Sequence, residues 1–313
     1  MRLPSEQPDP SPAAASTRKG DDDISPGYKV ADAIRAFSPD SVMWKVVRHR
    51  AILLDGPAAA VLQIAHPRVA LGVMEHSRFE DAPIGRLERT LNSVYAIAFG
   101  TREQANVAAR RVARRHSTVS GDAAAHDVPG EPRYSAAEID LLMWVVATLV
   151  WSAVHGYERS IGRLSDEEKE HFYRDMRILG TFFELPVNYG PQTYRDYVDY
   201  FDRQVADPLL GSHPVSRRVA WAVVRPRHPW WLKLAGPLLT FMFSEVLPAA
   251  VRDRLGFRST PFSRLSLSVA TIALRLFARF APGRLRLVRE YRDAIKDPKL
   301  TAGAMPASPF VVG

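Results

Sequence analysis

The chain has 313 residues and a mass of 35.0 kDa, which is enough for one large domain or two small ones with a substantial core. It carries 42 Lys and Arg against 34 Asp and Glu, a formal net charge of +8, and it has no cysteine. The lack of cysteine excludes disulfides, Cys-based zinc sites, iron–sulfur clusters and thiolate-ligated haem. The sequence contains no nucleic-acid-binding motif, so we expect no nucleic-acid partner.

The first 26 residues are rich in Pro, Ser, Ala and charge, which predicts a disordered tail. They lack the apolar core of a secretory signal, and together with the absence of cysteine this favours a cytoplasmic location. We expect a helical domain over 27–298 and a loose tail over 299–313. The nearest candidate for a membrane span, 230–250, is interrupted by Lys233, Glu245 and two prolines, so we expect a buried or membrane-surface helix there.

Apolar residues recur at helical spacing through most of the chain, and alternating strand patterns are almost absent. The sequence therefore predicts an all-α fold, with a polar loop over 121–132. Three pairs have the spacing of a capping box, namely Thr101 with Gln104, Ser135 with Glu138 and Ser165 with Glu168. We expect helices over 27–37, 41–55, 57–76 with a kink or boundary at Pro67, 86–99, 102–119, 136–158, 166–183, 193–205, 230–255, 261–280 and 284–296.

His116 lies near the end of an Ala- and Arg-rich predicted helix, where small residues leave room for a flat ligand. A helical histidine can donate its Nδ1–H to the carbonyl four residues earlier, here that of Val112, and so leave Nε2 to bind iron. The alternative is a surface histidine whose positive charge meets the helix dipole. On spacing alone this second interpretation is favoured.

Arg86, Arg89 and Thr90 share one face of a predicted helix, because positions i, i+3 and i+4 are neighbours. Two guanidinium groups and a hydroxyl together suit anionic propionates, or a polar reaction pocket above a metal. A solvated basic face is the alternative, and these three residues alone favour it.

Two further histidines stand beside apolar runs. His66 comes just before Pro67 and is typical of a core histidine with a hydrogen-bond partner. His76 belongs to a polar cluster that would suit a general base or a hydrogen-bond partner beside a ligand. On the most apolar predicted helix, Trp144 and Trp151 share a face, which is more typical of a core than of a cofactor wall.

Four segments follow one another in a characteristic order: LLDGPAAAVLQIAHPRVALGVMEHSRF, PIGRLERTLNSVYAIAFG, ARRVARRHSTVSG and YSAAEIDLLMWVVATLVWSAVHGYERSIGRLS. This ordered run is more specific than any single motif, and it resembles a known oxygenase family over roughly 40–290. The family joins the bacterial latex-clearing proteins, which cleave polyisoprene rubber, and the fungal oxygenase of mycophenolic acid biosynthesis.

The resemblance implies an all-helical, globin-like core around haem b and a reaction with O2. It implies that His116 is the proximal iron ligand and that Arg86 and Thr90 line the pocket. The latex-clearing proteins have a distal Lys where this chain has Arg89, and a guanidinium is a poor iron ligand. A second departure lies in the helix over 136–158, where Val145 and Trp151 replace a His and an acidic residue of many relatives.

We therefore expect a haem b-dependent oxygenase that acts with O2 on an apolar, isoprenoid or lipid-like small molecule. His116 is the expected iron ligand, with Arg86, Arg89, Thr90 and His76 as catalytic candidates. His66 and Val112 are further candidates for holding the cofactor. The alternative is a haem-binding or sensing protein without turnover, which Val145 and Trp151 favour. A peripheral membrane contact through the C-terminal basic helices is compatible with either function.

Overall fold

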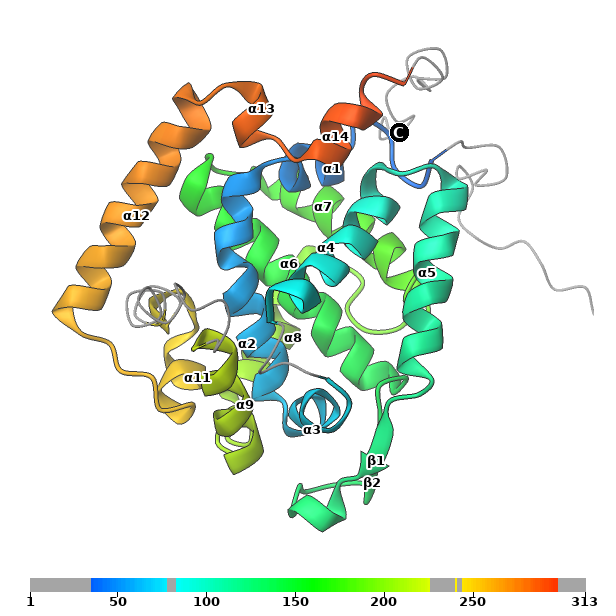
Figure 1. Ribbon diagram of the computed structural model, residues 1–313, viewed down its shortest axis with the longest axis vertical. Helices are drawn as coiled ribbons and strands as arrows, with labels where there is room; N and C mark the ends of the chain where they lie inside the picture. Colours follow the sequence, from blue (N-terminus) through cyan, green and yellow to red (C-terminus); the bar gives the residue numbers. More distant parts are fainter. Residues whose placement is uncertain (1–34, 78–82, 226–239, 241–243, 298–313) are drawn as a thin grey trace, which may run out of the picture. The chain divides into compact units, whose positions relative to one another are not determined.

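The computed structural model describes residues 35–77, 83–225, 240 and 244–297, all within one compact unit that begins at Ala33. The predicted all-α fold is confirmed, and the described part adds one small two-stranded sheet (Figure 1). The tails predicted over 1–26 and 299–313 lie outside the described residues, as does most of the segment 230–250. The helices are α1 (Val42–Val47), α2 (Gly56–Ala65), α3 (Pro67–His76), α4 (Pro83–Phe99), α5 (Arg102–His116), α6 (Ile139–Ser160), α7 (Asp166–Thr181), α8 (Tyr194–Ala206), α9 (Pro214–Val224), α11 (Ala249–Arg254), α12 (Pro261–Phe280), α13 (Gly283–Arg286) and α14 (Arg289–Ala294).

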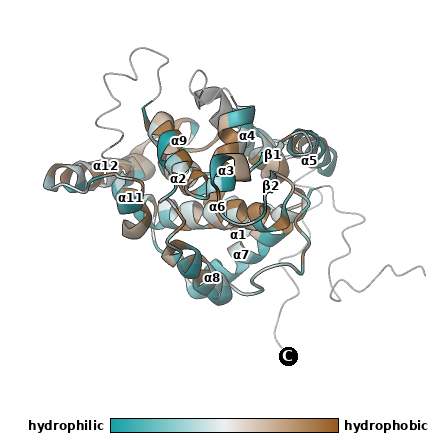
Figure 2. Cartoon of the chain, turned by 90° about the horizontal axis from the view of Figure 1, so that it is seen from below, coloured by the Kyte–Doolittle hydropathy of each residue, from teal (hydrophilic) through white to brown (hydrophobic). Residues whose placement is uncertain are grey.

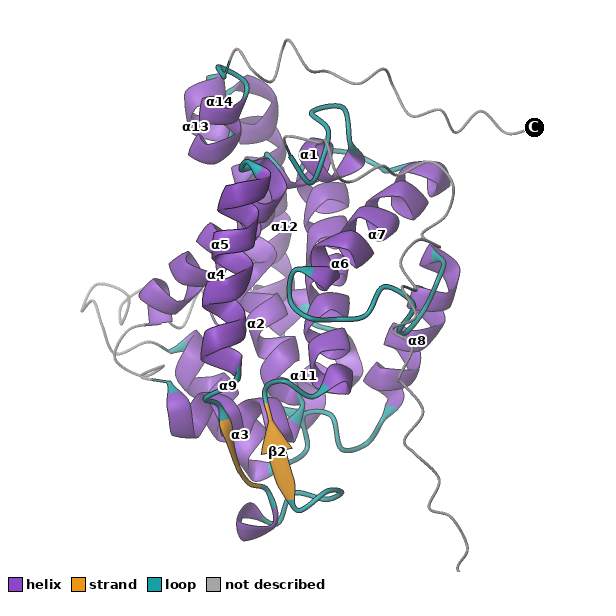
Figure 3. Ribbon diagram, turned by 90° about the vertical axis from the view of Figure 1, so that its right-hand side faces the viewer, coloured by secondary structure: helices purple, strands orange, loops and turns teal. Residues whose placement is uncertain are grey.

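Helix α6 is the central element of the described helices, and α2, α7 and α12 pack against it (Figure 3). The 3-10 helix η1 (Arg50–Asp55) packs against it as well. The rings of Trp144 and Trp151 both stack on Phe201 of α8, with centroids 5.8 Å and 5.9 Å away. Within the described chain α6 is the one helix long and apolar enough to cross a membrane, but most of it is buried by its neighbours. We therefore interpret α6 as a core helix, in agreement with the aromatic pattern in the sequence.

A sharp corner separates α2 from α3 at His66. The boundary follows from Pro67, whose ring starts α3 and removes the backbone donor that a continuous helix would need. The carbonyl of Ala65, left without a helical donor, accepts hydrogen bonds from the Gly211 amide at 2.9 Å and the Ser216 hydroxyl at 3.1 Å. These bonds attach α9 and the turn before it to the corner.

The turn at Gly100 joins α4 to α5, and the two helices pack against each other as they diverge from it (Figure 1). A Cβ at Gly100 would lie 2.2 Å from the Ala96 carbonyl oxygen, so the turn requires glycine. The predicted capping box is confirmed: Thr101 accepts from the Gln104 amide, and the Gln104 side chain accepts from the Thr101 amide at 2.8 Å. The turn and the cap together fix where α5 begins and where its other end, His116, is placed.

Five sequence-based expectations about the bounds of elements are wrong. The segment 121–132, predicted as a loop, is not only a loop, because β1 (Ser120–Asp122) pairs antiparallel with β2 (Arg133–Ser135) around the short η2 (Ala124–His126). Since Ser135 belongs to β2, it does not cap α6, although its amide still donates to Glu138 at 2.6 Å. Residues 41–55 form α1 and η1 rather than one helix, and 284–296 forms α13 and α14. Of the helix expected over 27–37, the described residues 35–37 are not helical.

Candidate functional site

His116 is the last residue of α5 and is half-buried. Its carbonyl accepts a hydrogen bond from the Val119 amide at 3.0 Å, which turns the chain toward β1. Among the described residues none forms a hydrogen bond with its ring, so the predicted bond from Nδ1 to the Val112 carbonyl is not formed. Both ring nitrogens are therefore available to a ligand.

Burial lowers the pKa of His116 below its ordinary value, and the nearby Glu184 carboxylate opposes that shift. The ring is consequently neutral at pH 7. Only a neutral imidazole has a free lone pair with which to ligate a metal. The electrostatic state of His116 thus meets the first requirement for a metal ligand.

Glu184 is a residue that the sequence reasoning missed. Its backbone adopts φ = 67°, a left-handed conformation in which glycine is the usual residue. The Leu185 amide donates to the Gly180 carbonyl at 3.1 Å and the Glu184 amide donates to the Thr181 carbonyl at 3.2 Å, the two bonds that end a helix in a Schellman motif. Glutamate here costs stability, and the same turn brings its charge close to His116.

The Arg86–Thr90 segment lies in α4, on the helix that packs against α5. The described side chains of this box, those of Arg89 and Thr90, are exposed, whereas the Arg86 side chain is outside the description. The Arg89 carbonyl accepts from the Ser93 hydroxyl at 3.0 Å within the helix. The fold therefore places the predicted polar box on a helix adjacent to the one that carries His116.

His66 occupies the corner between α2 and α3, and its Nδ1 is buried without a hydrogen-bond partner among the described residues. Burial, with a smaller contribution from the Arg68 charge, lowers the pKa of His66 to about 4. The acidic side chains of Asp140 and Asp207 act in the opposite direction. This histidine is not the satisfied core residue that the sequence favoured, because one of its polar atoms is left unpaired.

His76 belongs to a polar cluster that attaches the hairpin to α3. Its Nε2 donates to the Ser120 carbonyl at 3.0 Å. The adjacent Glu75 accepts from the Tyr134 hydroxyl, and one of its oxygens lies 2.8 Å from His126 Nε2. A role in attaching the hairpin accounts for these contacts, and nothing in them gives His76 a free reactive position.

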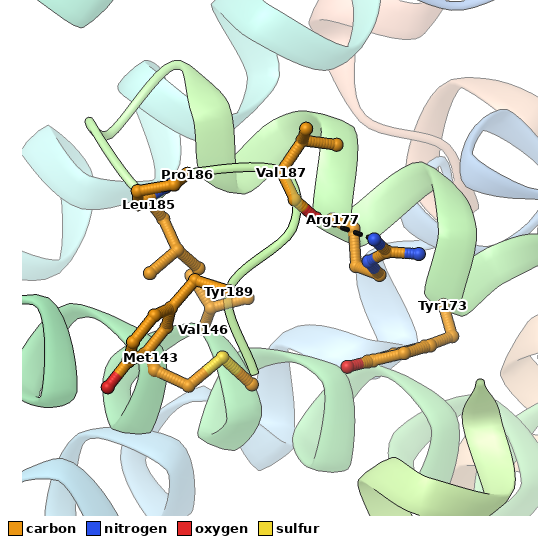
Figure 4. Close-up of a pocket in the computed structure, with 8 residues that line it drawn as sticks. All are labelled: Met143, Val146, Tyr173, Arg177, Leu185, Pro186, Val187 and Tyr189. Carbon is orange, nitrogen blue, oxygen red and sulfur yellow. Dashed lines mark hydrogen bonds between the residues drawn. The ribbon is translucent and has the colours of Figure 1, made fainter. Parts of the chain in front are cut away.

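A shallow cavity lies between α6, α7 and the segment that follows Glu184 (Figure 4). Its walls are mainly apolar, with Met143, Val146 and Leu185 on one side. Arg177 lies at the opposite side and donates from Nη2 to the Val187 carbonyl at 2.5 Å. The guanidinium is thus used to hold the loop, and the cavity itself offers apolar contacts.

Within the described ranges, no three His, Asp or Glu side chains converge closely enough to hold a bare metal ion. The conventional helical-histidine geometry, with Nδ1 bonded to the carbonyl four residues back, occurs instead at His155, 2.9 Å from the Trp151 carbonyl oxygen. His155 is exposed and its ring stacks on Trp151 with centroids 4.6 Å apart. We assign this histidine to packing at the surface of α6.

A protein-family model matches residues 44–282, and its description is ER-bound oxygenase mpaB/B'/Rubber oxygenase, catalytic domain. The chain belongs to this family. The match confirms the resemblance seen in the sequence and spans the fold from α1 to the end of α12. Searches of curated proteins and of solved structures gave no match.

Membership in the mpaB/rubber oxygenase family identifies residues 44–282 as the catalytic domain of an oxygenase family. His116 and the Arg86–Thr90 box both lie inside the matched segment. So does Trp151, which is buried between Phe201 and His155 and therefore serves the core of this chain. Val145 is half-buried on the same helix.

Proposed function

We propose that the protein is a haem b-dependent oxygenase that uses O2 on an apolar small molecule, and that His116 would hold the iron of the haem. The observation that carries this proposal is the state of His116. It is a half-buried neutral imidazole without a hydrogen bond to any described residue, at the end of a helix that packs against α4. Family membership supports the oxygenase reaction.

The donor set fits haem better than it fits a bare metal ion. A non-haem iron site of the facial type takes three side chains from the protein, and no such group occurs among the described residues. A porphyrin supplies four nitrogens of its own, so a single histidine is a sufficient protein ligand. The chemistry that haem b supplies when bound is the activation of O2.

The remaining residues of the proposed site would bind the cofactor and orient it. Arg86 and Arg89 would pair with the carboxylates of the cofactor, and the Thr90 hydroxyl would donate or accept a hydrogen bond beside them. A guanidinium keeps its proton, so Arg89 is a hydrogen-bond donor in this proposal and not a ligand. His66, with its unpaired buried Nδ1, is a second candidate for contact with a ligand.

An apolar substrate is supported by the rubber oxygenases that the family includes. The test is O2 uptake by the haem-reconstituted protein with a panel of terpenoids and unsaturated lipids, and with a polar alcohol as control. We expect uptake above the substrate-free rate for at least one apolar compound. We also expect the His116→Ala variant, treated identically, to remain at the substrate-free rate.

The second candidate is a protein that binds haem without turnover. Trp151 favours it, because a buried indole stands where an acidic residue of many relatives is expected. A protein that takes up haem but consumes no O2 with any member of the panel would establish this alternative against the oxygenase.

A further inference from the structure

Helix α12 carries an apolar stripe that none of the described residues covers. Its six large members are between 54% and 71% exposed. They follow one another at intervals of three and four residues, so they line a single face of the helix over its whole length. The stripe consists of Phe262, Leu265, Val269, Ile272, Leu276 and Phe280.

The opposite face of α12 is the one that attaches to the rest of the unit. Ser263 is buried and bonded to Glu245, and Leu267 packs against the core. Near the other end, Arg275 Nε donates to the Arg159 carbonyl in α6 at 2.7 Å. These contacts hold α12 at the margin of the described helices (Figure 2), and the exposed stripe lies on the face away from them.

The charge around the stripe is of one sign. Between residues 254 and 289 there are eight arginines and no Lys, Asp or Glu, so this segment alone accounts for the net charge of +8. Arg264, Arg275 and Arg279 lie on α12 itself, along one flank of the stripe. An apolar face bordered by arginines is the pattern of helices that lie in the interface of an anionic membrane.

We propose that α12 docks the protein on an anionic lipid surface, with its stripe in the acyl boundary and its arginines on the headgroups. A second copy of the chain is a poorer occupant, since it would bring two segments of eight arginines together. This inference goes beyond the proposed oxygenase function. It concerns a different surface, and its failure would leave haem binding by His116 unaffected.

The test is co-sedimentation of the full-length protein with vesicles of phosphatidylcholine alone or mixed with phosphatidylglycerol. We expect binding to the anionic vesicles that weakens as salt is raised. The variant Leu265→Gln with Ile272→Gln should lower the partition coefficient at least tenfold, because both side chains leave the acyl region. Arg264→Gln and Arg279→Gln should each lower it about fivefold at low salt.

The matched control is Val198→Gln with Leu209→Gln, which removes two exposed apolar side chains far from α12 in the sequence. It should bind vesicles as the wild type does, and circular dichroism should show that all variants are folded. The proposal is overturned if the wild type does not bind anionic vesicles, or if the control loses binding as strongly as the stripe variant. It is also overturned if sedimentation shows a dimer that the stripe variant dissociates.

Discussion

At the scale of single residues, the candidate site depends on how each imidazole is charged. His116 and His66 are both neutral at pH 7 because burial opposes the charged form. The Nε2 of His76 is engaged by the Ser120 carbonyl, and this residue belongs to the attachment of the hairpin. Neutral, unpaired imidazoles are the ones suited to a ligand, which singles out His116 and His66 from the histidines that the sequence proposed.

The state of His66 predicts a pH dependence of stability. Its pKa is about 4 in the folded protein and 6.5 in the unfolded chain, so the unfolded chain binds more protons between these values. Stability is therefore lost as pH falls from 6.5 toward 4, by about 2 kcal/mol at pH 4.5 for this residue. The His66→Gln variant should lack this loss. The measurement is the free energy of unfolding of the haem-free protein in urea, compared at pH 7.5 and pH 4.5.

Burial also lowers the pKa of His49 to about 4, and His49 is present in both the wild type and the variant. The informative quantity is therefore the difference in the free energy of unfolding between the wild type and the variant. That difference should move by about 2 kcal/mol in favour of the variant between the two pH values. A difference that does not change with pH would contradict the assigned pKa of His66.

The sequence could not have predicted the part that Glu184 plays. Its left-handed backbone follows from the way α7 ends, and the pattern that normally predicts such an ending is a glycine. The only local signal is Pro186, two residues further along the chain. The approach of its charge to His116 joins α5 with the end of α7, a tertiary relationship that spacing along the chain does not contain.

At the scale of elements, caps decide where the helices that carry the site begin. Thr101 and Ser165 form the reciprocal hydrogen bonds that their spacing predicted. Ser135 does not, because pairing of β2 with β1 competes for the same residues and α6 starts later. The local sequence therefore predicts a helix cap well where the capping residue has no strand partner. It fails where that residue pairs with a strand, as Ser135 does.

The cap of α5 can be tested directly. Thr101→Ala removes the acceptor for the Gln104 amide at the start of the helix that ends at His116. We expect a loss of about 1 kcal/mol in the free energy of unfolding, measured in urea. Thr118→Ala is the matched control, since the Thr118 hydroxyl donates to the Arg115 carbonyl just after the same helix. An equal loss in both variants would argue against the cap.

At the scale of the whole molecule, the all-α fold was predictable because its apolar residues recur at helical spacing along most of the chain. The core role of Trp144 and Trp151, which share one face of α6, was also predictable from this spacing. The sequence could not show which apolar residues of α12 are exposed and which are buried, because Leu265 and Leu267 are both leucines. Only packing shows which of the two faces water.

The central claim is that this oxygenase-family domain binds haem through His116. The most direct measurement is titration of the purified protein with haem b, followed by the Soret band. His155→Ala serves as the matched control, because it also removes a helical histidine but one engaged with Trp151. We predict a saturable Soret shift in the wild type and the His155 variant, and its loss in His116→Ala. An unchanged Soret band in His116→Ala, or no band in the wild type, would contradict the account.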